Sequence, residues 1–295
     1  MTIPPTEGRH RESAGLDRLP TSELVDLLVR DQADAVAAVR AQSATIGRVV
    51  DTIVARVNEG GRLHYVGAGT SGRLGVLDAS EMPPTFGTPP ELVCAHIAGG
   101  EDALRGAVEG AEDDAAAGDA QMRDHVRAGD AVVGISASGG APFVIAALER
   151  ARKTGAYTVA ITSVDASALV DAADEAIVAP TGAEVLAGST RLKAGTAQKI
   201  ALNAISTAVM VRLGKVYDNL MIDVVATNVK LHARALRLVR ELTDADEAAA
   251  RKALDASGGR VKVAVTMLLR GIDCAAASEL LDANGGRLRD VLSKA

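Results

Sequence analysis

The residues whose types and spacing suggest chemistry are hydroxyls in three glycine-containing turns. These residues are Gly69, Thr70 and Ser71 in the first turn, Ser136, Ser138 and Gly139 in the second, and Ser189 and Thr190 in the third. Each turn precedes a helical pattern, and free N–H groups together with the helix dipole favour an anion at a helix start. The first turn taken alone is explained equally well by helix capping. Three such turns on one sheet edge predict a phosphate site, with Lys193 or Arg191 as counter-charge. Taken singly, either base fits a solvated surface position.

The first turn also contains a G-x-G-x-x-G string at 67–72, which occurs in dinucleotide-binding proteins. That fingerprint requires an acid about 20 residues further on, at the end of the second strand. Glu91 comes before that strand, and the strand ends in uncharged residues at 97–100. The sequence therefore favours a phosphate group over a dinucleotide.

Acidic side chains form the second candidate group. Glu81 closes the helical segment after the first turn, where Pro83 and Pro84 are expected to stiffen the exit. Glu109 and Glu112 are spaced by three residues. Two carboxylates near one substrate act as acid and base when their pKa values differ, although most glutamates on Ala-rich helices are solvated.

Composition narrows the class of protein. The 295 residues carry a net charge of −6, with three Tyr, two Phe and no Trp, so neither a basic footprint nor a stacking platform for nucleic acid is expected. Cys94 and Cys274 are too few for a disulfide framework or a Cys-based metal site, and the five histidines have no ligand spacing. The beginning of the sequence lacks the apolar stretch of a secretory signal, and the longest uncharged run, 131–148, contains a turn. We expect a cytoplasmic protein without a metal, a membrane partner or a nucleic-acid partner.

The elements that position these residues follow from the hydrophobic pattern. Short apolar runs at 62–66, 92–98, 131–135, 157–162 and 175–179 predict strands, and Ala-rich stretches at 101–117 and 142–153 predict helices between them. This alternation predicts an α/β fold with a parallel sheet whose ligand lies at the carboxyl ends of the strands. Further helices are predicted from residue 21, at 43–58, and near 191–213 and 224–241.

Three regions are expected along the chain: an extended arm at 1–20, a main domain at 21–243 and a small helical domain at 244–295. The last contains a near-repeat at 254–261 and 281–288, in which each copy predicts a helix that ends in Gly-Gly before another helix begins.

Several longer strings resemble the N-acetylmuramic acid 6-phosphate etherase family. The strings are Tyr65–Gly87, Ile97–Glu101, Val108–Asp113, Gly182–Val185, Arg191–Lys199 and Gly214–Asn228. The resemblance implies a sugar-isomerase-type (SIS) phosphosugar fold, with a doubly wound five-stranded parallel sheet flanked by helices and a small C-terminal helical domain similar to ubiquitin-associated (UBA) domains. It also implies a homodimer, no cofactor, and removal of D-lactate from the 6-phosphate of N-acetylmuramic acid in amino-sugar recycling.

The family's two catalytic glutamates correspond to Glu81 and Glu112, which are expected to protonate the lactate oxygen and to remove the C2 proton, respectively. Glu109 is then a surface residue. The sequence departs from the family pattern at Gly140, Ala141 and Phe143, where the family has an Arg, a Thr and a Tyr. Two alternatives stay open: a phosphosugar isomerase on the same fold, and a non-catalytic phosphosugar sensor similar to glucokinase regulatory protein.

Overall fold

The computed structural model describes residues 4–223 and 229–293 and contains a five-stranded parallel sheet. The strands are β1 (Leu63–Gly67), β2 (Val93–Ile97), β3 (Ala131–Ile135), β4 (Tyr157–Thr162) and β5 (Glu175–Val178), in the order β2-β1-β3-β4-β5. Every residue of β1 and β3 is buried, as expected for the central strands of a parallel sheet covered on both faces. All five predicted strands are confirmed, with ends within one residue of the predicted ones.

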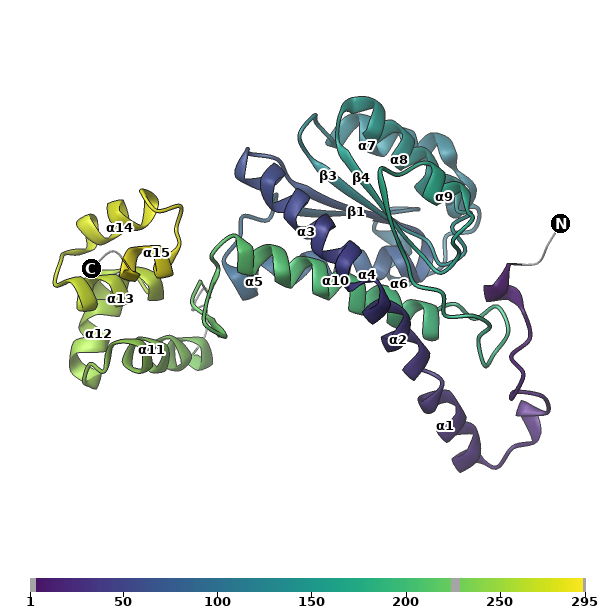
Figure 1. Ribbon diagram of the computed structural model, residues 1–295, viewed down its shortest axis with the longest axis horizontal. Helices are drawn as coiled ribbons and strands as arrows, with labels where there is room; N and C mark the ends of the chain where they lie inside the picture. Colours follow the sequence, from purple (N-terminus) through teal and green to yellow (C-terminus); the bar gives the residue numbers. More distant parts are fainter. Residues whose placement is uncertain (1–3, 224–228, 294–295) are drawn as a thin grey trace. The chain divides into compact units, whose positions relative to one another are not determined.

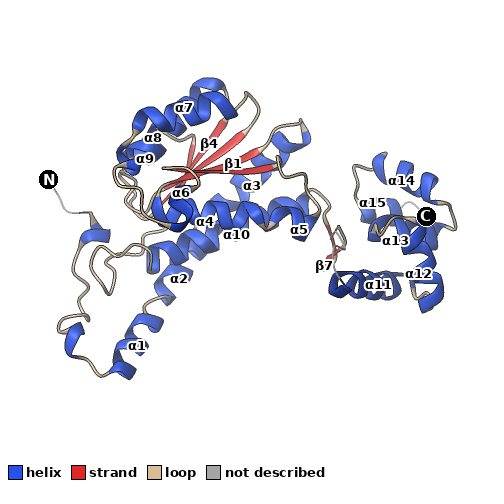
Figure 2. Cartoon of the chain, turned by 180° about the vertical axis from the view of Figure 1, so that it is seen from behind, coloured by secondary structure: helices blue, strands red, loops and turns tan. Residues whose placement is uncertain are grey.

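Helices cover the sheet on both faces (Figures 1 and 2). One layer consists of α7 (Ala115–His125), α8 (Pro142–Thr154) and α9 (Ala168–Asp171), and the other contains α3 (Ser43–Asn58), α4 (Gly69–Ser80) and α10 (Lys193–Arg212). The α8 side chains of Ala147 and Leu148 pack on Val66 and Val132 of the sheet, and all four are fully buried. The predicted doubly wound architecture is confirmed.

Small residues allow close approach in this core. A side chain at Gly118 of α7 would overlap the carbonyl oxygen of Phe143 in α8, and a Cβ on Gly134 of β3 would lie 2.8 Å from the Leu148 side chain. A chain with few aromatic residues therefore packs by bringing backbones together.

The predicted helix over 101–117 is wrong. The structure has α6 (Asp102–Arg105), a 3₁₀ turn η3 (Ala111–Asp113) and then α7. Gly110 adopts a positive φ of 73°, and the side chain of Asp114 accepts the N–H of Ala117 at 2.9 Å to begin α7. The glycine turn and the helix cap at Asp114 therefore interrupt this Ala-rich stretch, because their conformational preferences outweigh the helix propensity of alanine.

The amino-terminal region holds two short 3₁₀ turns, η1 (Pro5–Glu7) and η2 (Leu16–Arg18), followed by α1 (Thr21–Arg30) and α2 (Ala33–Ala41). Thr6 is fully buried, and a Cβ on Gly188 would lie 2.9 Å from a carboxylate oxygen of Glu7. The arm therefore lies against the loop that contains the third turn.

The chain forms two compact units, residues 1–79 with 91–206 and residues 80–90 with 207–295, hereafter the first and second units. The second unit contains α5 (Met82–Phe86), a short hairpin of β6 (Val216–Tyr217) and β7 (Leu220–Met221), and the helices α11 (Val229–Thr243), α12 (Glu247–Ala256), α13 (Val261–Arg270), α14 (Cys274–Asp282) and α15 (Leu288–Ser293). The predicted helix near 224–241 corresponds to α11, and residues 224–228 lie outside the described residues.

The division between the units falls at residue 206, whereas the sequence pattern predicted a boundary after residue 243. The reason is the apolar face of α11: Ala235, Leu238 and Val239 are buried in one core with residues of α12, α13 and α14. The repeat prediction is confirmed, because paired glycines with positive φ, at 258–259 and at 285–286, separate α12 from α13 and α14 from α15. The similarity of this helical region to UBA domains stays a prediction.

Candidate active site

The first turn is a tight connection between β1 and α4. A Cβ on Gly72 would lie 2.6 Å from Cγ1 of Ile97 and 2.7 Å from the carbonyl oxygen of Gly67, so the turn requires glycine there. The first N–H groups of a helix have no acceptor within it, and here they belong to Gly69, Thr70 and Ser71. The turn is therefore suited to an anion.

The second turn begins beside the first. Gly67 and Ile135 are partners in the parallel pairing of β1 with β3, so these two strands end at the same level of the sheet. Oγ of Ser136 accepts the N–H of Gly139 at 3.2 Å, and Oγ of Ser138 accepts the N–H of Gly140 at 3.3 Å. Each hydroxyl keeps its own hydrogen, which it can donate to a ligand oxygen.

The three departures from the family pattern near this turn have different surroundings. Ala141 and Phe143 are buried in the core of the first unit, at 2% and 3% exposure, so those positions contribute to packing. Gly140 is exposed. Of the three positions, Gly140 is therefore the one where a polar side chain would face solvent beside the turn.

The third turn reaches the first through α10. A Cβ on Gly195 would lie 3.4 Å from the carbonyl oxygen of Thr190 and 3.6 Å from Cγ2 of Thr70. One helical turn later, Oγ of Ser71 donates to Oε1 of Gln198 at 2.9 Å. The structure thus brings the three predicted turns together at one edge of the first unit. We call this set of turns the hydroxyl rim; that it binds phosphate stays a prediction.

The start of α10 is already satisfied from within the protein. The fully buried carboxylate of Glu184 accepts the N–H groups of Lys193 and Ala194 at 3.0 and 2.9 Å. The ammonium of Lys193 is 2% exposed and lies 2.9 Å from Asp31 and 3.4 Å from Asp34. Its predicted contact with phosphate is untested, and in this structure its charge is neutralised by carboxylates.

The predicted acid–base residues lie on two short elements. Glu81 stands between α4 and α5, is exposed and belongs to the second unit, whereas Glu112 is exposed on η3 in the first unit. Pro83 and Pro84 lie in the first turn of α5, which follows the end of α4 after Glu81; that they stiffen this exit stays a prediction. Proline suits that turn, since the N–H it lacks would have no acceptor there. Glu109 is exposed, as expected for a surface residue.

Of the two strand histidines, His64 is a fully buried core residue, as predicted, whereas His96 is half-buried. Nδ1 of His64 lies 3.0 Å from Nε2 of His96, the rings are stacked at 5.3 Å, and Gln121 lies 3.2 Å from the other nitrogen of His96. Burial lowers the pKa of His64 to about 4 and that of His96 to about 3, so both rings are neutral at pH 7. Within 4–223 and 229–293, no group of three or more His, Cys, Asp and Glu residues is arranged to hold a metal ion.

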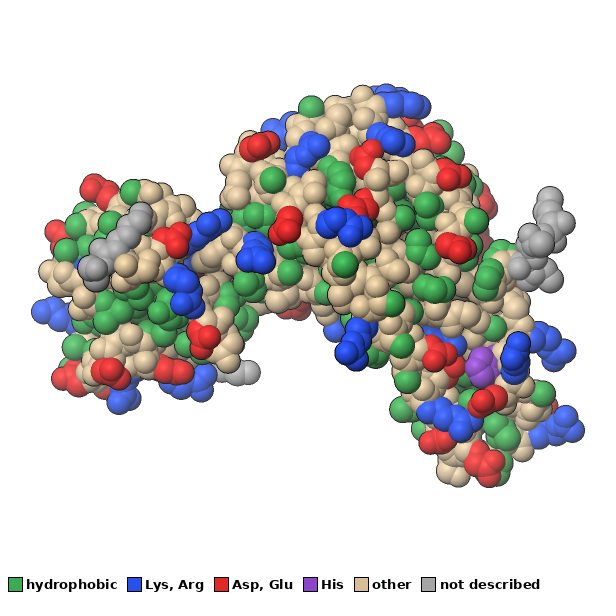
Figure 3. Space-filling model, viewed as in Figure 1, with side chains coloured by type: hydrophobic (Ala, Val, Ile, Leu, Met, Phe, Trp, Pro, Cys, Tyr) green, Lys and Arg blue, Asp and Glu red, His purple; other side chains and the backbone are tan. Residues whose placement is uncertain are grey.

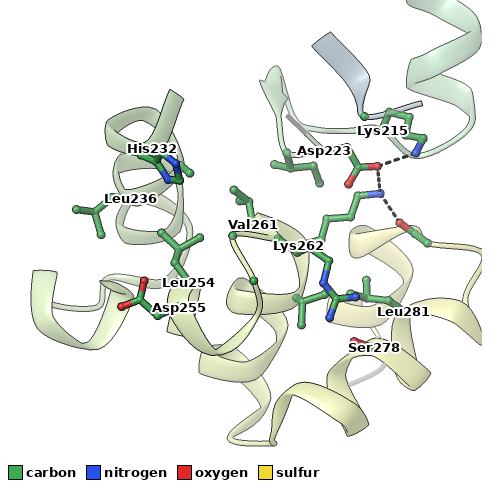
Figure 4. A pocket seen from close by; sticks show the side chains of 18 of the residues that line it. Lys215, Asp223, His232, Leu236, Leu254, Asp255, Val261, Lys262, Ser278 and Leu281 are labelled. Carbon is green, nitrogen blue, oxygen red and sulfur yellow. Dashed lines mark hydrogen bonds and ion pairs between the residues drawn. The ribbon is translucent and has the colours of Figure 1, made fainter. Parts of the chain in front are cut away.

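The second unit encloses a separate cavity of about 1000 Å³ (Figure 4). There, Lys215 and Lys262 share the carboxylate of Asp223 at 3.1 and 2.8 Å, and Lys262 also donates to the carbonyl oxygen of Gly286 at 2.7 Å. Burial lowers the pKa of Lys262, against the opposing effect of Asp223. None of the residues predicted to act in catalysis or phosphate binding lines this cavity.

Acidic and basic side chains are interspersed over the face of the protein drawn in Figure 3. Among the described residues, no helix is both long and apolar enough to cross a membrane.

Comparison with known proteins identifies the family. A relative from Symbiobacterium thermophilum, named N-acetylmuramic acid 6-phosphate etherase, is 53% identical over 90% of this chain and 89% of its own length. A relative of the same name from Serratia proteamaculans is 49% identical and covers 98% of both chains. The chain belongs to the N-acetylmuramic acid 6-phosphate etherase family. The resemblance in the sequence strings is thereby confirmed.

Domain comparisons agree with this etherase family and its fold. The family model for the SIS domain matches residues 111–208, and that for the glucokinase regulatory protein N-terminal SIS domain matches residues 45–152. A Bacteroides fragilis structure assigned to the phosphosugar isomerases aligns with a TM-score of 0.51 at 18% identity, over 68% of this chain and 95% of that one. At this identity the likeness concerns the fold.

Two polar residues next to the rim, Glu184 and Gln198, could not be predicted individually from the sequence. Glu184 caps α10 from nine residues away, and Gln198 meets Ser71 across 127 positions of sequence. Neither pairing has a local spacing that indicates it, although both residues lie in strings of the etherase resemblance. A buried cap or amide contact of this range becomes visible only once the chain is folded.

Proposed function

We propose that this chain is a carbon–oxygen lyase that cleaves the D-lactyl ether of N-acetylmuramic acid 6-phosphate, giving N-acetylglucosamine 6-phosphate and D-lactate. Membership of the etherase family over nine-tenths of the chain carries the proposal. The hydroxyl rim supports it, because it gathers neutral donors and free helix N–H groups where a phosphosugar would be held.

The chemistry needs an acid and a base. An ether resists direct hydrolysis at neutral pH, but the C3 ether of the opened sugar lies β to the C1 aldehyde. Removal of the C2 proton expels the lactate oxygen from C3 and leaves an unsaturated aldehyde, to which water then adds at C3. Proton transfer by a positioned side chain contributes roughly 10²–10⁴-fold at such a step.

The roles that we propose for the two glutamates follow from this requirement. Glu112 removes the C2 proton, and Glu81 protonates the departing lactate oxygen. The elimination and the addition of water use these two groups, together with water, and need no cofactor.

We propose that the phosphate is held by residues of all three turns. They are Gly69, Thr70, Ser71, Ser136, Ser138, Gly139, Ser189 and Thr190. Because the Lys193 ammonium is 2% exposed and lies 2.9 Å from Asp31, we propose that it fixes the start of α10 and acts on the phosphate indirectly. We further propose a cytoplasmic homodimer, as the family resemblance implies.

Lactate release from N-acetylmuramic acid 6-phosphate, measured with a coupled lactate dehydrogenase assay, tests this function. An etherase releases D-lactate, an isomerase converts the sugar without releasing lactate, and a sensor binds it unchanged. Glu81→Gln and Glu112→Gln keep the side-chain shape, and each should lower the rate more than 100-fold (about 2.7 kcal/mol of barrier) while phosphosugar binding persists. Glu109→Gln is the matched control and should leave the rate unchanged. Full lactate release by both site variants would refute the assignment of the two glutamates.

A further inference from the structure

The side chain of Gln198 has an unused donor at the hydroxyl rim. The residue is 3% exposed, its Oε1 accepts the hydroxyl hydrogen of Ser71 at 2.9 Å, and within the described part of the chain its Nε2 has no hydrogen-bond partner. Buried side-chain amides are almost always paired, because an unpaired N–H forfeits the bond that it makes with water. A buried amide with one free end beside a binding turn is therefore expected to have a partner that this structure does not contain.

The position of Gln198 indicates which partner this is. Gly195 lies one helical turn before it on α10, against Thr70 and Thr190, and residues three apart share a helix face. Gln198 therefore extends the face of α10 that joins the first and third turns. Its contact with Ser71 fixes the amide at the start of α4.

Two buried charged groups at the start of α10, Lys193 and Glu184, are already engaged. The ammonium of Lys193 is paired with Asp31 at 2.9 Å, and Glu184 accepts the first two N–H groups of α10. Apart from the exposed Arg191, the donors that the rim offers to an anion are therefore neutral, namely hydroxyls, free N–H groups of α4 and the Gln198 amide. Hydrogen bonds from neutral donors to an ionised oxygen are stronger than those between neutral groups.

We propose that Gln198 is a substrate-binding residue whose Nε2 donates to a phosphate oxygen of the phosphosugar, while its Oε1 holds Ser71 in place. This inference rests on the proposed function, since it assumes that the 6-phosphate occupies the hydroxyl rim. The bond is made in the bound substrate and in the bound product alike, so its loss weakens binding without changing the chemical step.

Two variants of the full-length protein distinguish the loss of the Gln198 donor from a disturbance of the fold. Gln198→Glu retains the shape and the oxygen that faces Ser71 but replaces the donor with an anionic oxygen, whereas Gln198→Met removes both the donor and that oxygen without adding charge. Gln32→Glu is the matched control: its Oε1 accepts from Thr196 of the same helix at 2.7 Å and its Nε2 donates to Leu28 at 3.3 Å, so this amide has no free end.

Binding of N-acetylglucosamine 6-phosphate, the proposed product, is measured by calorimetry together with kcat and KM for lactate release. We expect the affinity to fall about ten- to hundredfold in Gln198→Met and further in Gln198→Glu, with KM raised and kcat changed less than threefold. Gln32→Glu should bind like the parent protein. Binding of unphosphorylated N-acetylglucosamine, if measurable, should be equally weak in all variants.

Product affinity in Gln198→Met and Gln198→Glu within twofold of the parent would overturn the inference, as would a fall in kcat at constant KM. Equal losses in Gln198→Met and Gln32→Glu would assign the effect to the packing of α10 and would also overturn it. Absence of lactate release by the parent protein would refute the proposed function. If that parent still binds the phosphosugar through Gln198, the inference on binding stands.

Discussion

Asp78 anchors the helix that leads to Glu81, and its removal should be costly. The carboxylate is 3% exposed and accepts hydrogen bonds from Oη of Tyr65 at 2.9 Å, Nδ2 of Asn203 at 2.6 Å and Oγ of Ser206 at 3.1 Å. These bonds tie α4 to β1 and to α10. Burial together with the nearby Asp78 charge raises the pKa of Tyr65 well above its usual value, so the phenol remains a donor.

The expected loss of stability follows from the donors whose carboxylate acceptor Asp78→Ala would remove. Tyr65 is fully buried, at 0% exposure, and a buried donor left unpaired costs about 1–3 kcal/mol. Asn203 also loses its bond to the carboxylate, whereas Ser206 retains the carbonyl oxygen of Asn203 as an acceptor at 3.4 Å. With the small cavity added, we expect the free energy of unfolding to fall by about 3–5 kcal/mol. Asp78→Asn keeps one acceptor oxygen and should cost about 1–2 kcal/mol.

Urea unfolding followed by circular dichroism measures both values, and the exposed Asp51→Ala on α3 serves as a control expected within about 0.5 kcal/mol of the parent. Lactate release should also fall in Asp78→Ala, since α4 leads directly into Glu81. A loss below 1 kcal/mol in Asp78→Ala, or equal losses in both Asp78 variants, would refute this reasoning.

Three further outcomes are expected. The pKa values of His64 and His96 are lowered from 6.5 to about 4 and 3, so the unfolded chain binds protons that the folded chain does not. Stability should therefore be complete above pH 6.5 and fall as the pH drops toward 4, by up to about 1.4 kcal/mol per pH unit for each histidine; urea midpoints that stay constant from pH 7 to 4.5 would contradict this. Glu184→Ala leaves the start of α10 uncapped and should cost about 2 kcal/mol in the same urea assay, and a neutral effect would show that the cap is dispensable. Gly72→Ala forces a methyl group against Ile97 and should cost about 1–3 kcal/mol and weaken binding of the product phosphosugar, whereas unchanged binding would separate this turn from the phosphate site.

The sheet and the three turns could be predicted because their signals are local. A buried parallel strand appears in the sequence as a short apolar run. The glycine turn with hydroxyl side chains follows directly after the strand, as at 131–139. Alanine content was a weaker guide over 101–117, where Gly110 and the Asp114 cap divide the predicted helix.

What could not be predicted depends on contacts between distant residues. The charge of Lys193 indicates a phosphate ligand in sequence, but the fold places Asp31 beside it, 162 positions away. In the same way, nothing in the sequence around Gln198 predicts its contact with Ser71, which the fold brings next to it. The residue types and their spacing in the sequence thus predicted the hydroxyl rim. Contacts between residues far apart in the sequence determine which donors beside it have no partner within the protein.

The central claim is that the ether is lost by elimination across C2 and C3, with water added back at C3. The direct test is turnover of N-acetylmuramic acid 6-phosphate by the parent protein in H₂¹⁸O and, separately, in D₂O, with both products examined by mass spectrometry and NMR. The account predicts ¹⁸O in the C3 hydroxyl of N-acetylglucosamine 6-phosphate, deuterium at its C2 and unlabelled D-lactate. Label in the lactate hydroxyl, with hydrogen retained at C2, would mean that water attacks the lactyl carbon and would contradict the roles given to Glu81 and Glu112.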